Sequence, residues 1–334
     1  MSTVGVVIPF YQRDGELVRK ALASVARQAL PPDTMIRIFL VDDESPFPSA
    51  EVLGRLPHDF PVPITALSQK NAGPGAARNA GLRAARDHGV DYVAFLDSDD
   101  IWYPGHIETA LSMLSEEATF YFSNGQHDAV DAMFYNKYIA RHHQRGDDRY
   151  CPERRVADAG EFLDALLDEC IPHTSQVVYD LKRHPDIRFK HHFRRAAEDH
   201  TCWIEIVGQA KKVAYSTTVF GERGRGVSIY RDTLNWDLDT AGQRVLEEIA
   251  FRRSLLVHYG DRPGCRAMLD ANLTRRELSI IFLAARGVHK APLKAISVLA
   301  RAASSDPRIL LRLPSIVLQL PSYYRDLKAG RAAV

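Results

Sequence analysis

Short apolar runs alternate with amphipathic segments over the first 100 residues of this 334-residue chain. Four runs have the length and composition of buried strands: residues 4–10, 36–41, 64–67 and 92–96. Between the runs, residues 16–30 and 76–88 place their apolar side chains at helical spacing. Because strand and helix alternate, the sequence predicts an α/β fold with a mostly parallel, doubly wound, Rossmann-like sheet.

The pattern changes in the second half of the chain. Strand-like and helical segments continue to about residue 230, whereas from Leu234 onward the periodicity is purely helical. A hydrophobic content of 46% and a charged content of 25% are ordinary for a globular protein, and the length allows two domains. We therefore predict an α/β domain at residues 1–230 and a helical extension at residues 231–334.

Charge is distributed unevenly along the chain. The formal net charge is only +1, which argues against a dedicated nucleic-acid-binding protein. Residues 286–331 nevertheless hold nine Lys or Arg and two acids, so this segment carries +7 and the remainder −6. The segment combines these cations with apolar helical faces and two adjacent tyrosines, Tyr323 and Tyr324. We interpret it either as helices with a solvated basic face or as a peripheral contact with an anionic membrane.

The composition also bears on the compartment. The four cysteines lie far apart and form no CxxC pair, which favours reduced thiols over a disulfide framework or a zinc site. The first predicted strand begins at residue 4, and no run reaches the roughly 18 apolar residues of a membrane-spanning helix. We expect a cytoplasmic protein without a signal peptide, located on the inner face of the cell membrane if the extension binds lipid.

Three carboxylates follow the strand at residues 92–96, in the run Asp97-Ser98-Asp99-Asp100. The carboxyl end of a parallel strand faces the crevice in which open α/β sheets bind ligands. Two acids separated by one residue, such as Asp97 and Asp99, can bind the same small cation, and a diphosphate can complete its coordination. The alternative interpretation is an acidic turn with helix-capping aspartates.

Two other strand ends carry polar residues, Phe10-Tyr11 and Asp42-Asp43. Parallel pairing of the strands would bring these residues to the same edge of the sheet as the carboxylates. Tyr11 can stack on a nucleobase while Asp43 accepts a hydrogen bond from an imino N–H. The coincidence therefore indicates a nucleotide site, although each residue alone is also an ordinary turn former.

A glycine-containing segment at residues 71–81 leaves a strand and opens a helix. The third glycine of a dinucleotide fingerprint is replaced by Arg78, and Pro74 lies inside the loop, so the motif is weak. We interpret it as a turn whose helix presents Arg78 to a carboxylate or phosphate, with a surface arginine as the alternative. Later in the chain Asp199 is either a helix N-cap or a catalytic base.

Taken together, these residues resemble the inverting glycosyltransferase family 2, which has the GT-A nucleotide-sugar-binding fold. The resemblance covers about residues 3–230. Five motifs carry it in the expected order: VIPFY at 7–11, VDDES at 41–45, the segment 71–81, FLDSDD at 95–100 with Trp102 and Pro104, and Glu198-Asp199. Residues 8–13, 21–25 and 41–46 are also similar to bacterial succinoglycan-type exopolysaccharide glucosyltransferases.

The resemblance implies roles for individual residues. Asp99 would hold Mg²⁺ or Mn²⁺ on the diphosphate, Asp97 would face the ribose and donor sugar, and Asp199 would be the general base. The other implied donor-binding residues are Pro9, Phe10, Tyr11, Asp42, Asp43, Ser45, Asn71, Gly75, Arg78, Ser98, Arg223, Arg225 and Ser228. The last three represent a basic loop that is less recognisable here, and Gln12 replaces the common Asn after the first strand.

The implied activity is transfer of a sugar, with glucose favoured, from a UDP-sugar donor to a hydroxyl of a growing lipid-linked oligosaccharide. Inversion at the anomeric carbon would give a β-glycosidic bond in exopolysaccharide biosynthesis. One alternative is a sugar-nucleotide nucleotidyltransferase, although residues 11–16 lack the glycine-rich, lysine-bearing loop that it needs. The other is a catalytically silent nucleotide-sugar-binding module. A homodimer is compatible with the sequence, which does not fix the oligomeric state.

Overall fold

The computed structural model describes residues 1–127, 131–132, 154–227 and 237–329. The chain divides into two compact units. One comprises Met1–Arg194 with Glu198–Val227, and the other comprises Arg195–Ala197 with the described residues after Val227. The predicted boundary between residues 230 and 231 lies outside the described ranges, so it stays a prediction.

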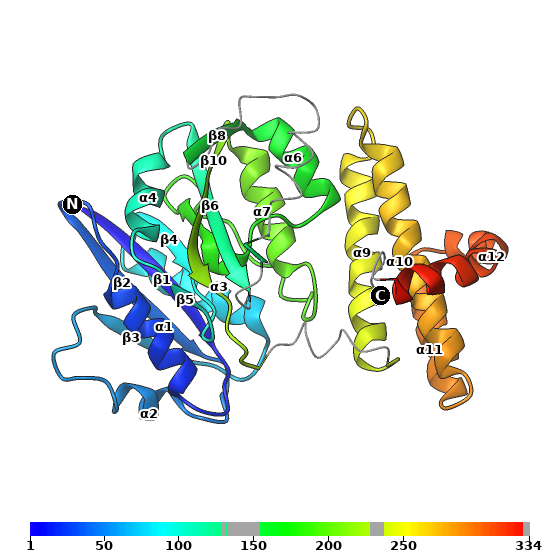
Figure 1. Cartoon of the computed structure of the whole chain (residues 1–334), viewed down its shortest axis with the longest axis horizontal. Coiled ribbons are helices and arrows are strands. Elements are labelled where there is room, and N and C mark those ends of the chain that lie inside the picture. Colours follow the sequence, from blue (N-terminus) through cyan, green and yellow to red (C-terminus); the bar gives the residue numbers. More distant parts are fainter. Residues whose placement is uncertain (128–130, 133–153, 228–236, 330–334) are drawn as a thin grey trace. The chain divides into compact units, whose positions relative to one another are not determined.

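A mixed sheet of ten strands forms the centre of the first unit, within the residues that the structure describes (Figure 1). Its main order is β3-β2-β1-β4-β9-β6-β10-β5, with β7 paired to β6 and β8 to β10. The strands are β1 (Ser2–Phe10), β2 (Thr34–Asp42), β3 (Ile64–Ser68), β4 (Tyr92–Phe95), β5 (Ile101–Trp102), β6 (Ala118–His127), β7 (Asp131–Ala132), β8 (Arg154–Asp158), β9 (Val177–Asp180) and β10 (Lys212–Glu222).

The predicted α/β class is confirmed, with one topological difference. Strands β3, β2, β1 and β4 are parallel to one another, as their alternation with helices predicts. Strand β9 enters antiparallel between β4 and β6. Hydrophobic pattern does not encode strand direction, which depends on how the connection runs.

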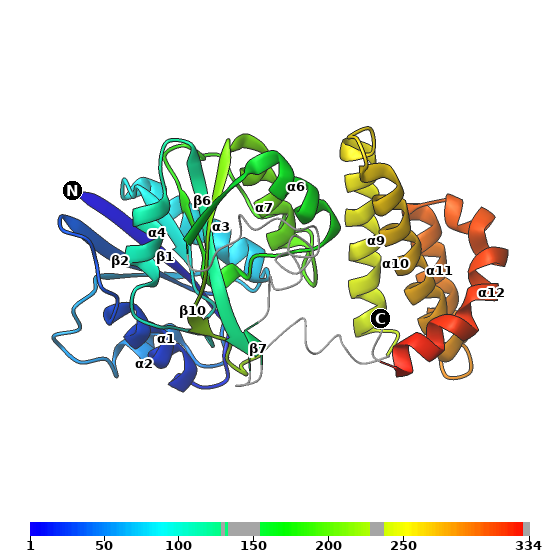
Figure 2. The same cartoon turned by 45° about the horizontal axis from the view of Figure 1, so that its top comes forward.

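Helices cover both faces of this sheet (Figure 2). They are α1 (Glu16–Ala26), α2 (Ser49–Leu53), α3 (Pro74–Asp87), α4 (His106–Met113), α6 (Ala159–Asp168) and α7 (Glu198–Gln209), with the short 3-10 turn η1 (Thr174–Gln176). Helix α1 ends before the expected residue 30, because the Gln28 side chain turns back and donates to the carbonyl of Ser24, 3.2 Å away.

The alternation of side chains along β1 decides which helix packs on which face. Val6 and Ile8 belong to a buried cluster with Leu22 of α1 and Ile107 of α4. Val7 points to the other face, where it lies against Gly81 of α3. The absence of a side chain at Gly81 lets α3 approach the sheet closely.

The second unit is helical, as predicted, in its described residues. It contains α9 (Thr240–Tyr259), α10 (Cys265–Gly287), α11 (Pro292–Ser305) and α12 (Arg308–Lys328). Helices α9, α11 and α12 each contact α10. None of the described helices has the length and apolar character needed to span a membrane.

We predict that Gly81→Ala destabilises the protein by about 1–3 kcal/mol, because the new Cβ would lie 2.4 Å from Cγ1 of Val7. Urea denaturation of the full chain measures this change. Gly208→Ala, in α7, is the matched control: its Cβ would meet nothing within 4 Å, so stability should stay equal or rise by up to about 1 kcal/mol. Equal stability of the two variants would contradict the predicted close approach.

Candidate active site

The carboxyl ends of β1, β2 and β4 meet at one edge of the sheet. Phe10 is the register partner of Asp42, and Val7 that of Phe95. The residues that follow these strands therefore enter the same region, which is the crevice position of an open α/β sheet. The three polar clusters that the sequence singled out are brought together by this pairing.

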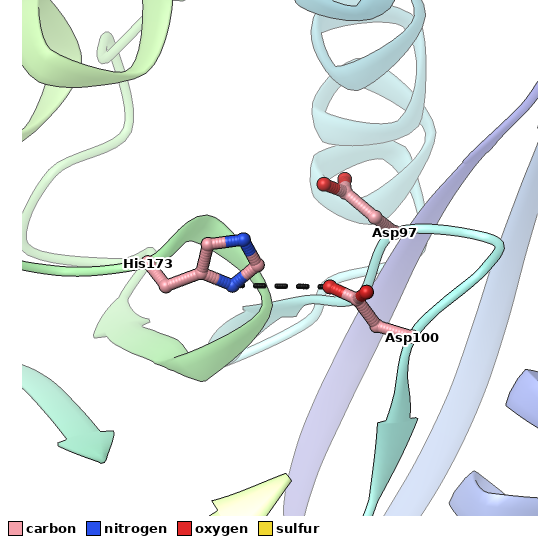
Figure 3. A group of neighbouring side chains, drawn as sticks. All are labelled: Asp97, Asp100 and His173. Atoms are coloured by element: carbon pink, nitrogen blue, oxygen red, sulfur yellow. Dashed lines mark ion pairs between the residues drawn. The ribbon is translucent and has the colours of Figure 1, made fainter. Parts of the chain in front are cut away.

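Asp97, Asp100 and His173 form a group whose potential ligand atoms all lie within 4.8 Å of one another (Figure 3). His173 Nδ1 is 3.8 Å from Oδ2 of Asp100. Ser175 holds the two aspartates in place, since its hydroxyl donates to Asp100 Oδ2 at 2.5 Å and accepts the N–H of Asp97 at 3.0 Å. Two carboxylates and an imidazole form a donor set suited to a divalent cation such as Mn²⁺.

The three carboxyl groups of the loop at residues 97–100 differ in the direction in which their pKa is shifted. Burial alone would raise the pKa of Asp97, but the charges of Arg78 and His173 lower it below its ordinary value. Burial and the charge of Asp97 raise the pKa of Asp99. Burial, together with the charges of Asp97 and Asp99, raises the pKa of Asp100 to about 8. A divalent cation would relieve this repulsion between neighbouring carboxylates.

A glycine-rich loop after β10 lies directly on the acidic loop. Gly224 N–H donates to Asp100 Oδ1 at 2.9 Å and Gly226 N–H to Asp99 Oδ2 at 2.8 Å. A Cβ on Gly224 would lie 1.7 Å from the carbonyl oxygen of Asp99. The loop needs glycine because its backbone approaches the acids so closely.

Gln12 ties this glycine-rich loop to two others. Its amide nitrogen donates to Ser98 Oγ at 3.1 Å, and its amide oxygen accepts the N–H of Val227 at 3.2 Å. Its own backbone N–H donates to the hydroxyl of Ser45 at 2.8 Å, and that hydroxyl donates back to the Gln12 carbonyl. Gln12 is 4% exposed, so it positions the loops rather than presenting itself to a ligand.

Arg78 joins the acidic loop to the start of α7. Its guanidinium donates to Asp97 Oδ1 at 2.7 Å and to Glu198 Oε1 at 3.2 Å, and it stacks over the ring of Phe189. Burial would lower the pKa of Arg78, but the carboxylates of Asp97 and Glu198 outweigh it and raise the pKa. Burial and the charge of Asp199 raise the pKa of Glu198 to about 7. The predicted anion for Arg78 is thus supplied by the protein's own carboxylates.

Asp199 lies in the first turn of α7, next to Glu198. Its Oδ2 accepts the hydroxyl proton of Thr174 at 3.1 Å, and its Oδ1 accepts the N–H of His200 at 2.7 Å. These contacts fix a half-buried carboxylate beside the residues that hold the acid cluster. The role of Asp199 as a general base stays a prediction.

The two aspartates at the end of β2 organise loops. Asp43 accepts hydrogen bonds from the N–H groups of Ala72 and Gly73, both at 2.9 Å, and from the side chain of Gln69 at 2.7 Å. Asp42 accepts hydrogen bonds from the backbone N–H groups of Ser45 and Ser49, both at 2.7 Å. Asp43 thus fixes the turn that precedes α3, and its role as an acceptor for a nucleobase stays a prediction.

Other predicted donor-binding residues differ in accessibility. The Tyr11 ring is 39% exposed and Pro9 is half-buried, whereas the Phe10 side chain is fully buried in the core. Phe10 therefore cannot offer its ring to a ligand, because alternation along β1 turns that side chain inward. Asn71 is exposed, and Gly75 packs against Glu198, where a Cβ would lie 3.3 Å from Glu198 Cγ.

An open cavity of about 370 Å³ lies beside the ends of β2 and β3. It is lined by Asp42, Glu44, Ser45, Ser68, Gln69 and Lys70. Two predicted donor residues, Asp42 and Ser45, are among these. The cavity thus lies at the same edge of the sheet as the ends of these two strands.

The structure places the basic-loop residues unequally. Arg223 is half-buried, and its charge lowers the pKa of Asp97 and opposes the raised pKa of Asp99. Arg225 is exposed. Ser228 lies outside the described residues. The carboxylate of Asp99, the predicted metal ligand, accepts Gly226 N–H and does not belong to the group of converging ligand atoms, which in the described residues comes from Asp97, Asp100 and His173.

Sequence reasoning missed several residues of this site. His173, Thr174 and Ser175 come from the turn before β9. The motif Glu198-Asp199 suggested a role for Asp199 but none for Glu198. The polar run Pro172-His173-Thr174-Ser175-Gln176 directly before an apolar strand was the available signal. It was ambiguous because the antiparallel insertion of β9, which carries this run to the acids, is a tertiary event.

The chain is similar in sequence to known proteins. The profile of glycosyl transferase family 2 matches residues 5–196. Over 313 residues the chain is 30% identical to the succinoglycan biosynthesis protein ExoW of Rhizobium meliloti (strain 1021), covering 93% of this chain and 96% of ExoW.

Two solved structures show the same fold. TarS 1-349 of S. aureus, in complex with UDP-GlcNAc, has a TM-score of 0.50 and 16% identity, covering 94% of this chain and 92% of that one. The mannosyltransferase PcManGT from Pyrobaculum calidifontis, in complex with GDP-Man and Mn²⁺, has a TM-score of 0.51 and 14% identity, covering 98% and 83%. The predicted GT-A fold is confirmed.

The raised pKa of Asp100 predicts that the free energy of unfolding decreases as pH rises from 5 to 8 in EDTA. The folded protein keeps this proton to about pH 8, whereas the unfolded carboxyl loses it near pH 4, so the folded state binds more protons in between. One such group contributes a slope of at most about 1.4 kcal/mol per pH unit. Urea denaturation at several pH values should show a shallower decrease for Asp100→Asn and no change for the exposed Asp87→Asn. Parallel curves for all three proteins would exclude a protonated Asp100.

Proposed function

The chain belongs to glycosyl transferase family 2, and we propose that it transfers glucose from UDP-glucose to a hydroxyl of a growing, lipid-linked oligosaccharide during exopolysaccharide biosynthesis. The product is a β-glycoside formed with inversion. The similarity to ExoW supports the biosynthetic context, since it extends over 93% of this chain. The TarS and PcManGT complexes support a nucleotide-sugar donor bound by this fold.

One observation carries the proposal: a buried ion-pair chain connects the acid cluster to the candidate base. Asp97 pairs with Arg78, Arg78 with Glu198, and the next residue is Asp199. Transfer of a glycosyl group needs a donor-binding region and a base at a fixed relative position. A guanidinium held by two carboxylates provides that fixed relation, because both pairs are largely shielded from water.

The donor would bind across the carboxyl edge of the sheet. The exposed ring of Tyr11 is available to stack on uracil, and Asp42 and Ser45 line the cavity of about 370 Å³ at the ends of β2 and β3. Arg223 and Arg225 lie on the loop that covers the acids and would contact the diphosphate. Ser98 and Asn71 complete the set by holding the neighbouring loops, through Gln12 and Asp43 respectively.

The donor set of Asp97, Asp100 and His173 fits Mn²⁺ better than Mg²⁺, because imidazole is a ligand that Mn²⁺ accepts more readily. When bound, the ion would neutralise charge on the diphosphate as UDP departs. Asp99, the ligand predicted from the sequence, directly precedes Asp100. Its carboxylate would be free to bind the ion if the hydrogen bond from Gly226 N–H were broken.

The protein's own groups account for the remaining steps. Asp199 accepts the proton of the acceptor hydroxyl. The hydroxyl of Thr174, which donates to Asp199 Oδ2, keeps the carboxylate oriented. The hydroxyl oxygen then attacks the anomeric carbon on the face opposite the UDP oxygen, so the C–O bond to UDP breaks as the new one forms. A single displacement inverts the α-linked donor to a β-glycoside. The covering loop of Gly224 and Gly226 limits water at the diphosphate.

We predict that Asp199→Asn lowers kcat for sugar transfer by about 10²–10⁴-fold, because an amide cannot accept the acceptor proton. Affinity for UDP should stay within about twofold, since Asp199 does not contact the donor diphosphate in this proposal. Transfer assays with UDP-[14C]glucose and calorimetric titration with UDP measure the two quantities. Full activity of Asp199→Asn would remove Asp199 from the mechanism.

We also predict that UDP binds in the presence of Mn²⁺ at least about tenfold more tightly than in EDTA, and more tightly than GDP or dTDP. Replacing Asp100 by Asn should reduce the Mn²⁺ effect by removing a ligand oxygen, whereas Asp87→Asn should leave it unchanged. Isothermal titration calorimetry gives each constant. Binding of no nucleotide, or binding indifferent to Mn²⁺ and to Asp100→Asn, would contradict the proposed donor site.

A further inference from the structure

Helix α12 of the second unit has one face that is fixed in the protein interior. Ile309, Ile316 and Tyr323 repeat every seven residues, which places them on the same side of the helix, and all three are buried. Leu327 continues this stripe. The buried face packs on α10 and α11 (Figures 1 and 2).

Specific contacts prevent α12 from turning about its axis. The hydroxyls of Tyr323 and Ser279 of α10 share a buried hydrogen bond of 2.7 Å, and the Phe282 ring meets the Tyr323 ring edge-on. At the other end Arg312 pairs with Glu277, a fully buried carboxylate of α10, at 3.3 Å. Because both ends are anchored, the opposite face of α12 stays directed away from α10.

That opposite face is strongly apolar. The side chains of Leu311 and Leu318, seven residues apart, are 83% and 82% exposed. Leu310 and Val317, also seven apart, are 61% and 50% exposed. Leu313 extends the face at one edge, whereas the Tyr324 ring at its margin stacks on Phe282 of α10. A contiguous row of exposed large apolar residues along a helix marks a contact surface rather than scattered surface hydrophobics.

Exposed cations lie on α12 and on the neighbouring helix α11. Arg325 and Lys328 of α12 are exposed, as is Arg301 of α11. Within the described part of the chain none of these three has a carboxylate at ion-pair distance. In contrast, Arg308 and Arg312 are engaged with Asp306 and Glu277. The net charge of +7 over residues 286–331 gives the region a positive field.

We propose that the outward face of α12, defined by Leu310, Leu311, Leu313, Val317 and Leu318, binds the surface of an anionic lipid bilayer. The helix lies in the plane of the interface, with its leucines among the acyl chains near the headgroups. Arg325, Lys328 and Arg301 contact lipid phosphates. The charge pattern favours lipid over a second copy of the chain, because two such faces would bring like charges together.

Sedimentation of the full chain with vesicles tests this surface without using transfer activity, so its result is independent of the proposed function. Binding to phosphatidylcholine vesicles that contain 30% phosphatidylglycerol should exceed binding to pure phosphatidylcholine and should decrease between 0.1 and 0.5 M NaCl. Replacing both Leu311 and Leu318 by Ser should weaken binding at least about tenfold, since two large side chains no longer enter the bilayer. Both residues are exposed, so the thermal midpoint should not change.

Two further variants separate apolar from charged contributions. Replacing Arg325 and Lys328 by Gln should remove most of the preference for phosphatidylglycerol, at roughly fivefold per charge. Replacing Val257 and Met35 by Ser is the matched control, since these side chains are 68% and 43% exposed but lie outside α12, and binding should not change.

Equal binding of the Leu311→Ser, Leu318→Ser protein and the unaltered chain would overturn the proposal. So would the failure of the unaltered chain to bind anionic vesicles. If light scattering in that case shows a dimer that the same double substitution dissociates, the face belongs to a contact between two copies of this chain.

Discussion

The buried guanidinium of Arg78 is the contact on which the site depends. It lies between Asp97, which follows β4, and Glu198, which begins α7, two positions separated by about a hundred residues of chain. Without Arg78 these two carboxylates would face each other and Asp199 in a region shielded from water, and the start of α7 would be repelled from the sheet. Removing one partner of such a buried network commonly costs about 3–5 kcal/mol. The same contact therefore stabilises the fold and sets the distance between the acid cluster and Asp199.

The remaining loops are arranged around this ion-pair chain by hydrogen bonds to the backbone. Asp43 holds the turn before α3, which carries Arg78, and Gln12 connects the loops after β1, β4 and β10. The glycine-rich loop donates to Asp99 and Asp100 at the positions where charge repulsion is greatest. Carboxylates that the sequence suggests as ligands therefore also have a structural function, because they accept the hydrogen bonds that fix the loops. Among the residues that the structure describes, Asp97, Asp100 and His173 form a group whose potential ligand atoms converge.

Much of the fold was readable from local pattern. Period-two and period-3.6 hydrophobicity gave the strands, the helices and the change to a helical unit, because burial on one face demands these spacings. The polar residues after β1, β2 and β4 were readable as a site because parallel strands end at a common edge. Phe10 shows the limit of that reasoning: it stands beside Tyr11 in the motif, but alternation along β1 turns its ring into the core.

The sequence by itself therefore determined the α/β architecture, the edge at which the chemistry collects, the family of the chain and the amphipathic character of α12. The tertiary structure decided which side chains meet. The antiparallel entry of β9 brings His173 to Asp100, the start of α7 brings Glu198 to Arg78, and the anchors on α10 decide which face of α12 stays exposed. These contacts join residues that are 35 to 120 positions apart in the sequence, or they fix the rotation of a helix. Local propensity carries no information about distant partners, so only the folded tertiary structure specifies such contacts.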